Sequence, residues 1–333
     1  MKNLIECIPN FSEGQNPKVI AAIAQAIESV EGVFLLHQDS GFAAHRTVYT
    51  FAGEAEAVIE GAYRAIQVAS ELIDMRKQQG EHPRIGACDV CPFVPISGIS
   101  IEELKPLVYE LAKKVQQDFQ IPIYLYEESA SNSERRNLAK HRIGNYEKLA
   151  ERLTKWKPDF GNLFNPKSGG TVMGVRNFLV AYNINLNTRN ASIAQEIAYD
   201  LRELGRPLGN VNGKTKYQAG LLKHVKAIGW YIEDFKKAQV SINLTNYQAT
   251  SLYEVFENTK NLAQKYGVAV SGSELIGLIP KAALIETGAL YLKNSDATET
   301  EKIESAINQL GLDELKPFDK QKRILEYRIA HFQ

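Results

Sequence analysis

The order of predicted elements repeats along the chain, and this repeat constrains the fold more than any other feature. In the first half, β-branched and apolar runs predict strands at 4–8, 33–36, 47–51 and 90–96, and helical spacing predicts helices at 17–27 and 57–73. In the second half the same patterns predict strands at 178–184, 225–232, 240–244 and 268–271, with helices at 191–204 and 251–266. Each half therefore has the order strand, helix, strand, strand, helix, strand, which is that of a split βαβ unit.

Two such units predict an α/β (α+β) fold of two similar subdomains, each a mixed β-sheet with helices on one face. The 333 residues are enough for two domains. We expect an N-terminal subdomain at 1–176, a C-terminal subdomain at 177–295 and a helical tail at 296–333. Proline donates no backbone hydrogen bond, so Pro92 and Pro95 predict that the strand at 90–96 is an edge strand or an irregular one.

A stretch rich in glycine and proline, 158–174, separates the two halves. It contains too many breakers for a regular element, so we expect a linker at the junction of the subdomains. Ligands commonly bind where two rigid bodies meet, which makes this linker a candidate binding segment. A plain connector is the equally weighted alternative.

Composition excludes several classes of protein. Lys plus Arg and Asp plus Glu both number 39, so no global field attracts the chain to nucleic acid or to a membrane surface. No apolar run approaches the ~20 residues of a membrane span, and the N-terminus lacks the pattern of a secretory signal. The chain has only three cysteines, which argues against a disulfide framework. We expect a cytoplasmic protein with reduced thiols.

The polar loop at 74–89 contains the main candidate for chemistry, His82. An unperturbed imidazole titrates near pH ~6.5, so a histidine fixed on a structured loop can take and return a proton at neutral pH. Pro83 directly follows and would stiffen the loop. A structural histidine is the alternative interpretation.

Asp39 and Arg46 flank the connection between the second and third predicted strands, which also contains His45. A carboxylate can orient a histidine or raise its pKa. A guanidinium group can hold a carboxylate through two parallel hydrogen bonds, which suits an amino-acid substrate. A surface hairpin with ordinary charges is the alternative.

Other motifs of known chemistry are absent or incomplete. Cys88 and Cys91 have redox or zinc spacing, but a structural zinc site needs four ligands, and the two side chains would point to opposite faces of a strand. We therefore expect no metal. The chain also lacks a Walker sequence, a dinucleotide-binding glycine motif and a serine nucleophile elbow.

Blocks of sequence resemble the glutamate formimidoyltransferase (glutamate formiminotransferase) family. These blocks are CIPNFSEG (7–14), RTVYTF (46–51), LIDMR (72–76), GEHPR (80–84), DVCPF (89–93), PDFG (158–161), GVRNF (174–178), NINL (183–186), GWY (229–231) and RILEY (323–327). They cover nearly the whole chain in the family's order. The chain resembles the stand-alone form of the domain that animals fuse to a cyclodeaminase.

The resemblance implies transfer of the formimino group from N-formimino-L-glutamate to N5 of tetrahydrofolate in histidine degradation, with tetrahydrofolate as co-substrate and L-glutamate released. It also implies a ligand tunnel between the two subdomains. By position, the catalytic histidine falls on His82. The folate-contacting stretch falls on Gly161, Asn162, Leu163, Phe164, Asn165, Pro166, Lys167, Ser168, Gly169 and Gly170.

Asn10, Asp39 and Arg46 lie in or near other matched blocks. We expect Asp39 to orient His82 or balance its charge, and Asn10 to hold the tetrahedral species. Arg46 or Arg84 would bind the carboxylates of glutamate.

Two alternative functions stay open. One is an enzyme that moves the formyl group of 5-formyl-tetrahydrofolate to glutamate in the same pocket. The other is a non-catalytic protein that channels folate to a separate cyclodeaminase. The tail helices leave room for a homodimer without requiring one.

Overall fold

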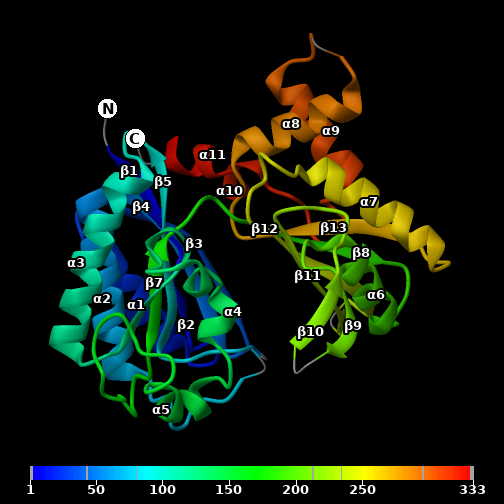
Figure 1. Ribbon diagram of the computed structural model, residues 1–333. Coiled ribbons are helices and arrows are strands. Elements are labelled where there is room, and N and C mark those ends of the chain that lie inside the picture. The colour runs from blue at the N-terminus through cyan, green and yellow to red at the C-terminus, as the bar shows by residue number, and fades with distance from the viewer. Residues whose placement is uncertain are drawn as a thin grey trace. The chain divides into compact units, whose positions relative to one another are not determined.

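The computed structural model describes residues 3–42, 44–80, 82–211, 214–233, 235–294 and 296–330 (Figure 1). The chain divides into two compact units, Met1–Asn177 and Phe178–Gln333. Each unit combines a β-sheet with helices and has its own apolar core. The predicted α/β fold of two subdomains is therefore confirmed. The ligand tunnel stays a prediction.

The first unit contains a seven-stranded sheet, three long helices and several short ones. In chain order its elements are β1 (Leu4–Cys7), β2 (Asn10–Phe11), α1 (Pro17–Glu28), β3 (Val33–Gly41), β4 (Arg46–Glu54), α2 (Ala55–Leu72), β5 (Cys88–Ser97), α3 (Ile101–Phe119), β6 (Ile123–Leu125), η1 (Glu127–Ser129), η2 (Ser133–Arg136), α4 (Leu138–His141), η3 (Tyr146–Lys148), α5 (Leu149–Arg152) and β7 (Thr171–Val175).

The strands β1 to β5 of this sheet form the predicted split βαβ unit, with β1 and β2 together in one position. β1 and β2 act as one interrupted strand, because both pair antiparallel with β4 on one side and with β5 on the other. β3 pairs antiparallel with β4. β7 then pairs parallel with β5, and β6 pairs parallel with β7. The last two strands extend the sheet beyond the predicted unit and make it mixed.

Of the two alternatives predicted for 90–96, the edge strand is wrong and the irregular strand is confirmed, because the register shifts in its pairings with β1 and β2. β5 is central, with β1 and β2 on one side and β7 on the other. Its prolines still supply acceptors, as Pro92 O accepts from Ile8 N at 3.1 Å. A register shift between Leu4 and Ile5 adjusts the pairing near Pro95.

The prediction that 158–174 links the two subdomains is also wrong. This stretch lies within the first unit, and its last residues enter the central strand β7. Residues 168–175 are buried throughout. After Gly170 the only breaker of this stretch is Gly174, which interrupts the short apolar run of β7, so this run does not by its sequence indicate a strand.

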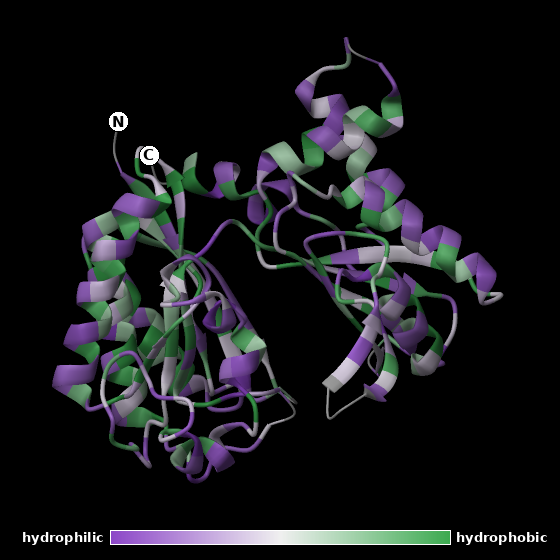
Figure 2. Cartoon of the chain, viewed as in Figure 1, coloured by the Kyte–Doolittle hydropathy of each residue, from purple (hydrophilic) through white to green (hydrophobic). Residues whose placement is uncertain are grey.

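The helices α1, α2 and α3 cover one face of this sheet (Figure 1). Tyr49 and Phe51 of β4 point into the core beneath them. Side chains alternate along a strand, so Arg46 and Val48 point to the other face, which we call the second face. Over β5, β7 and β6, the segment 127–156 covers the second face with a smaller apolar cluster. Figure 2 shows polar and apolar residues alternating around the three helices, as one-sided burial requires.

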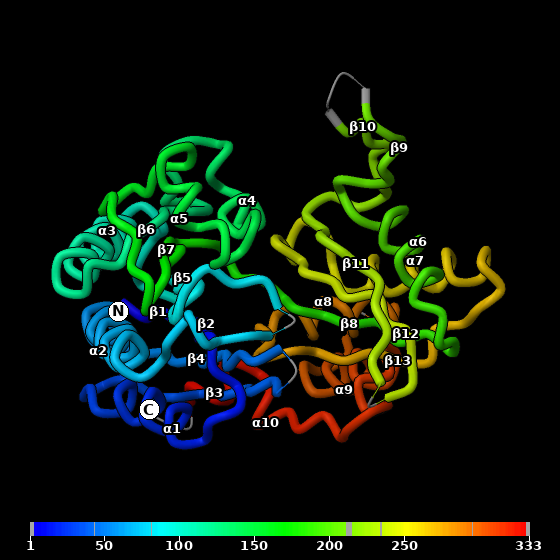
Figure 3. The backbone as a smooth tube through the Cα atoms, turned by 90° about the horizontal axis from the view of Figure 1, so that it is seen from below, coloured from blue at the N-terminus to red at the C-terminus, as the bar shows by residue number. Residues whose placement is uncertain are grey.

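The second unit repeats the strand order of the first. Its elements are β8 (Val180–Leu186), α6 (Ala191–Leu201), β9 (Arg206–Val211), β10 (Lys214–Gln218), β11 (Val225–Ile232), β12 (Lys237–Leu244), α7 (Leu252–Lys265), β13 (Val270–Ile276), α8 (Lys281–Leu292), α9 (Glu299–Leu310), α10 (Lys320–Arg323) and α11 (Leu325–Ala330). The sheet order β11-β12-β8-β13 corresponds to β3-β4-β1/β2-β5. All its pairings are antiparallel, so this sheet is not mixed. The hairpin of β9 and β10 projects from the unit (Figure 3).

The segment predicted as a helical tail packs into the core of the second unit. Ile303 and Leu310 of α9 are buried in one cluster with Leu284 of α8. α9 begins with a capping box between Thr298 and Glu301, which satisfies backbone donors of its first turn. Across the described residues, no helix has both the length and the apolar character to cross a membrane.

Candidate active site

Side chains from five parts of the first unit meet around the guanidinium group of Arg46, the first residue of β4. Arg46 Nε donates to Asn10 Oδ1 on β2 at 2.8 Å, and Nη2 lies 2.9 Å from Asp89 Oδ2 on β5. Nη1 lies 3.1 Å from His82 Nδ1. Arg142, directly after α4, also contacts Asp89. We call these five residues the Arg46 cluster.

A β-bulge in β5 directs Asp89 into the cluster. Asn10 pairs with Val90 and Phe11 with Cys88, so Asp89 is an extra residue on its strand. The Asp89 carboxylate is fully buried and accepts from the backbone N of Ile85 at 2.9 Å. Burial by itself raises the pKa of Asp89, but the guanidinium groups of Arg142 and Arg46 outweigh burial and hold this pKa below its usual value. Asp89 is therefore a carboxylate anion between two cations.

The same bulge overturns the prediction that Cys88 and Cys91 point to opposite faces. The extra residue shifts the alternation, and both side chains lie in the first unit's main core. Cys91 Sγ lies 3.6 Å from Cys7 Sγ, and all three cysteines are free thiols. Burial raises the pKa of each thiol, so they remain protonated. Within the described part of the chain, no group of three or more His, Cys, Asp or Glu side chains could hold a metal ion.

The contacts of His82 determine which ring nitrogen carries the proton. Nδ1 lies 2.8 Å from Pro83 O and 3.1 Å from Nη1 of Arg46. A carbonyl oxygen can only accept, so an unprotonated Nδ1 would set two lone pairs against each other at the shorter distance. We therefore assign the proton to Nδ1, which donates to Pro83 O. The lone pair then lies on Nε2, which is the basic atom.

The surroundings of His82 keep its imidazole neutral. Burial and then the positive charges of Arg46 and Arg142 lower the pKa of His82 to about 4, against the opposing effects of the Pro83 hydrogen bond and of Asp89. Burial also lowers the pKa of Arg46, to about 10, so its guanidinium group stays protonated at neutral pH. At pH 7 the cluster therefore presents an unprotonated Nε2 beside a fixed cation.

Asp39 shares the second face with the cluster but does not contact His82. It pairs with Val48, which in turn pairs with Asn10, so the three side chains form a row across the sheet. The Asp39 side chain is exposed and has no hydrogen bond or ion pair with any residue that the structure describes. The groups that contact His82 are Arg46 and Pro83 instead. The role expected of Asp39 stays a prediction.

Arg84 holds the loop that carries His82 in place. Its Nη2 and Nη1 donate to the two carboxylate oxygens of Glu147 at 2.7 and 3.0 Å, and Nε donates to Gln78 Oε1 at 2.6 Å. Each of the three guanidinium nitrogens of Arg84 thus already donates a hydrogen bond to an acceptor of the protein. This arrangement favours a structural role over the predicted contact with a substrate carboxylate.

The predicted folate stretch lies directly against the loop that carries His82. Ala87 N donates to Ser168 O at 2.8 Å and Gly170 N donates to Ile85 O at 3.0 Å, around a bridge between Gly86 and Gly169. Earlier in the stretch, Asn165 Nδ2 donates to the carbonyl oxygen of Phe119, the last residue of α3. Its exposed side chains are Asn162, Leu163 and Pro166. The stretch therefore presents exposed side chains beside the loop that carries His82.

Two members of the cluster were not predicted as site residues. Asp89 could have been suspected, because a carboxylate at the start of a buried strand needs a partner. Arg142 gave no signal, because it follows Lys140 and His141 in a stretch that resembles a solvated surface. Glu81, within the matched block GEHPR, lies outside the described residues.

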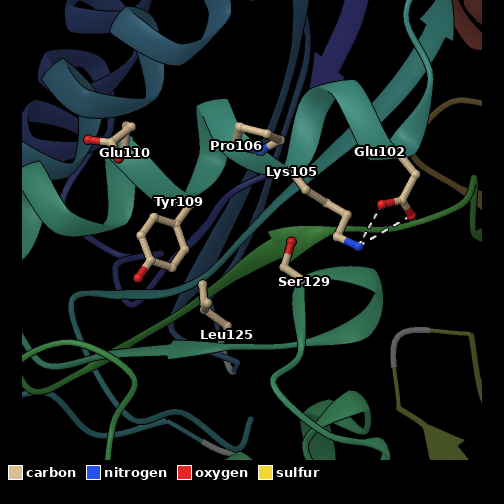
Figure 4. A pocket seen from close by; sticks show the side chains of 7 residues that line it. All are labelled: Glu102, Lys105, Pro106, Tyr109, Glu110, Leu125 and Ser129. Carbon is tan, nitrogen blue, oxygen red and sulfur yellow. Dashed lines mark hydrogen bonds and ion pairs between the residues drawn. The ribbon is translucent and has the colours of Figure 1, made fainter.

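A separate cavity of about 430 Å³ lies beside α3 (Figure 4). It is lined by Glu102, Lys105, Pro106, Tyr109, Glu110, Leu125 and Ser129. Lys105 Nζ is paired with Glu102 at 2.9 Å, which leaves its charge compensated. No residue of the Arg46 cluster or of the predicted folate stretch lines this cavity, so it is not part of the candidate active site.

Both units of the chain match models of known protein domains. Residues 4–176 match the N-terminal subdomain of the formiminotransferase domain, and residues 181–330 match the formiminotransferase domain. Formimidoyltransferase-cyclodeaminase of Rattus norvegicus is 45% identical over an alignment that covers 99% of this chain and 60% of that protein. Glutamate formimidoyltransferase of Streptococcus pyogenes serotype M1 is 44% identical over 89% of this chain and 95% of its own length. Its counterpart in Thermoplasma acidophilum is 38% identical over 92% of this chain and 99% of its own length.

Proposed function

The chain belongs to the formiminotransferase family, and we propose on this premise that it is a glutamate formimidoyltransferase. It would transfer the formimino group of N-formimino-L-glutamate to N5 of tetrahydrofolate and release L-glutamate, as a step of histidine degradation. The observation that carries this proposal is the neutral His82 with a basic Nε2, held in a cluster that suits proton transfer. Similarity over 95% or more of two glutamate formimidoyltransferases supports it.

In the proposed reaction, His82 serves in both proton transfers. Nε2 takes the N5 proton as N5 attacks the formimino carbon. The imidazolium then gives that proton to the glutamate nitrogen as the bond between this nitrogen and the carbon breaks. Because burial and then the positive charges of Arg46 and Arg142 lower the pKa of His82, the imidazolium gives up its proton readily in the second transfer.

The other site residues have supporting roles in this proposal. Asn10 helps to stabilise the tetrahedral species, and Arg46 binds a carboxylate of the substrate. Asp39 contributes charge from the same sheet face. The stretch 161–170 contacts tetrahydrofolate, the co-substrate, through its exposed side chains, and no metal takes part.

An assay of 5-formimino-tetrahydrofolate formation tests the proposal. Wild-type protein should form this product from N-formimino-L-glutamate, and His82→Gln should lower turnover by about 10² to 10⁴-fold while folate binding persists. A His82→Gln protein with near-normal turnover would contradict the acid-base role of His82.

The same assay separates the two alternatives. Product formation from 5-formyl-tetrahydrofolate and glutamate, but not from formiminoglutamate, would favour the formyltransferase. Folate binding without any glutamate release would favour the channelling protein. The names of the bifunctional relatives make a separate cyclodeaminase the natural partner to test next. A cytoplasmic location and a homodimer complete the proposal.

A further inference from the structure

The Arg46 cluster contains more positive charge than negative charge. Arg46 and Arg142 are cations, whereas Asp89 is the single carboxylate that contacts them among the described residues. His82 is neutral at pH 7. The nearby carboxylate of Glu147 is taken by Arg84, and that of Glu13 by His45. Because buried charges are normally paired, the cluster has room for one more anion.

One hydrogen-bond donor of Arg142, its Nε, lacks an acceptor among the described residues. Its Nη2 donates to Asp89, but its Nε is buried and has no hydrogen-bond partner within the described part of the chain. The Arg142 side chain as a whole is 14% exposed. Buried guanidinium N–H groups normally have an acceptor, so the missing acceptor points to a ligand.

We infer that Arg142, together with Arg46, binds the α-carboxylate of N-formimino-L-glutamate, an inference that rests on the proposed function. A guanidinium group binds a carboxylate through parallel hydrogen bonds. The α-carboxylate fits better than the γ-carboxylate, because the α-carbon also carries the nitrogen that leaves. Arg46 lies 3.1 Å from the His82 ring, so a carboxylate held by the two guanidinium groups brings this nitrogen near the imidazole.

Binding of the carboxylate would also change the acidity of His82. The charges of Arg46 and Arg142 both lower the pKa of His82. A bound carboxylate offsets those charges and moves the pKa back toward its ordinary value. The substrate would thus bring the pKa of His82 nearer to the working pH, where one imidazole can both take the N5 proton and return it.

Steady-state kinetics of two variants test the inference. Arg142→Met removes the guanidinium group, and Arg142→Lys keeps a cation beside Asp89 but removes Nε. We expect Arg142→Met to raise the KM for N-formimino-L-glutamate by about 30-fold or more, and Arg142→Lys to give a smaller rise. The KM for tetrahydrofolate should change by less than about twofold in both variants. The matched control is Arg136→Met, because Arg136 lies in the same segment but pairs with Glu128.

A titration separates this inference from the proposed function. The imidazole signals of His82, followed by NMR against pH, should shift to a higher pKa when L-glutamate is added to the wild type, and should not shift in Arg142→Met at the same L-glutamate concentration. An unchanged KM for formiminoglutamate, or an equal rise in both KM values, would overturn the inference. A wild-type His82 that ignores L-glutamate would also overturn it. Wild-type protein that responds to L-glutamate but makes no 5-formimino-tetrahydrofolate would contradict the proposed function alone.

Discussion

The lowered pKa of His82 links the stability of the protein to pH. The pKa is about 4 in the folded chain and near 6.5 in an unfolded one, so the unfolded state binds more protons between these values. Stability is therefore lost as pH falls from about 6.5 toward 4, and His82 accounts for roughly 2 kcal/mol of that loss by pH 5. Urea unfolding at pH 7 and pH 5 should show a smaller acid loss for His82→Gln than for the wild type. Equal losses would mean that His82 titrates normally.

Replacing Asp89 and replacing Asp39 should have very different effects on stability, because one carboxylate is buried and the other is exposed. Asp89→Asn leaves two guanidinium groups without their buried counterion, so we expect a loss of about 3 to 5 kcal/mol in the free energy of unfolding. Asp39 is exposed and unpaired among the described residues, so Asp39→Asn should change stability by less than about 0.5 kcal/mol. Denaturant curves measure both. Turnover of the stable Asp39→Asn protein then tests its proposed role, since normal turnover would remove it from the reaction.

The residues of the candidate site were predicted only in part. Asn10, Arg46 and His82 were identified, and the structure brings them together. Asp89 and Arg142 were missed, because their function depends on contacts between residues 53 positions apart. Sequence patterns describe neighbours along the chain, whereas a β-bulge and a long-range ion pair appear only when the sheet is assembled.

A contact between backbones fixes the predicted folate stretch to the loop that carries His82. Gly169 has φ +68°, and a Cβ there would lie 2.2 Å from Ile85 O. Gly169→Ala should therefore cost more than about 2 kcal/mol of stability and lower turnover, because the loop with His82 must shift. The control is Gly267→Ala, where φ is +70° but a Cβ meets nothing within 4 Å, so only the backbone strain of about 1 kcal/mol applies. Similar urea midpoints for the two variants would show that the backbone at Ile85 can move away from the added Cβ at little cost in stability.

Long periodic elements were predictable, and irregular ones were not. The helices α1, α2, α6 and α7 and most strands follow their apolar spacing closely. α3 was overlooked although it has clear signals, a capping box between Ser100 and Glu103 and buried residues at helical spacing. Asn132 and Asn137 cap two of the short helices in 127–152, but the segment also depends on longer-range hydrogen bonds, such as those from Arg152 to the carbonyl oxygens of Lys140 and Ile143. No local pattern of the sequence encodes such contacts.

At the scale of the whole molecule, each unit has its own core, and the Arg46 cluster belongs entirely to the first. Its contacts come from β2, β4, β5, the loop before β5 and the residue after α4. The repeat of strand order explains this independence, because each split βαβ unit closes its own sheet and buries its own helices.

A fragment of residues 1–177 should therefore fold without the second unit and keep its cluster. We expect a cooperative urea transition for this fragment, and an NMR titration in which the pKa of His82 stays near 4. A fragment of residues 178–333 should also unfold cooperatively, which controls for damage from the cut at the unit boundary. If the first fragment folds but His82 titrates near its ordinary 6.5, the lowered pKa requires more of the chain than the Arg46 cluster. Since burial is the largest cause of the lowered pKa, the size of that change would measure how much of the burial of His82 the first unit provides alone.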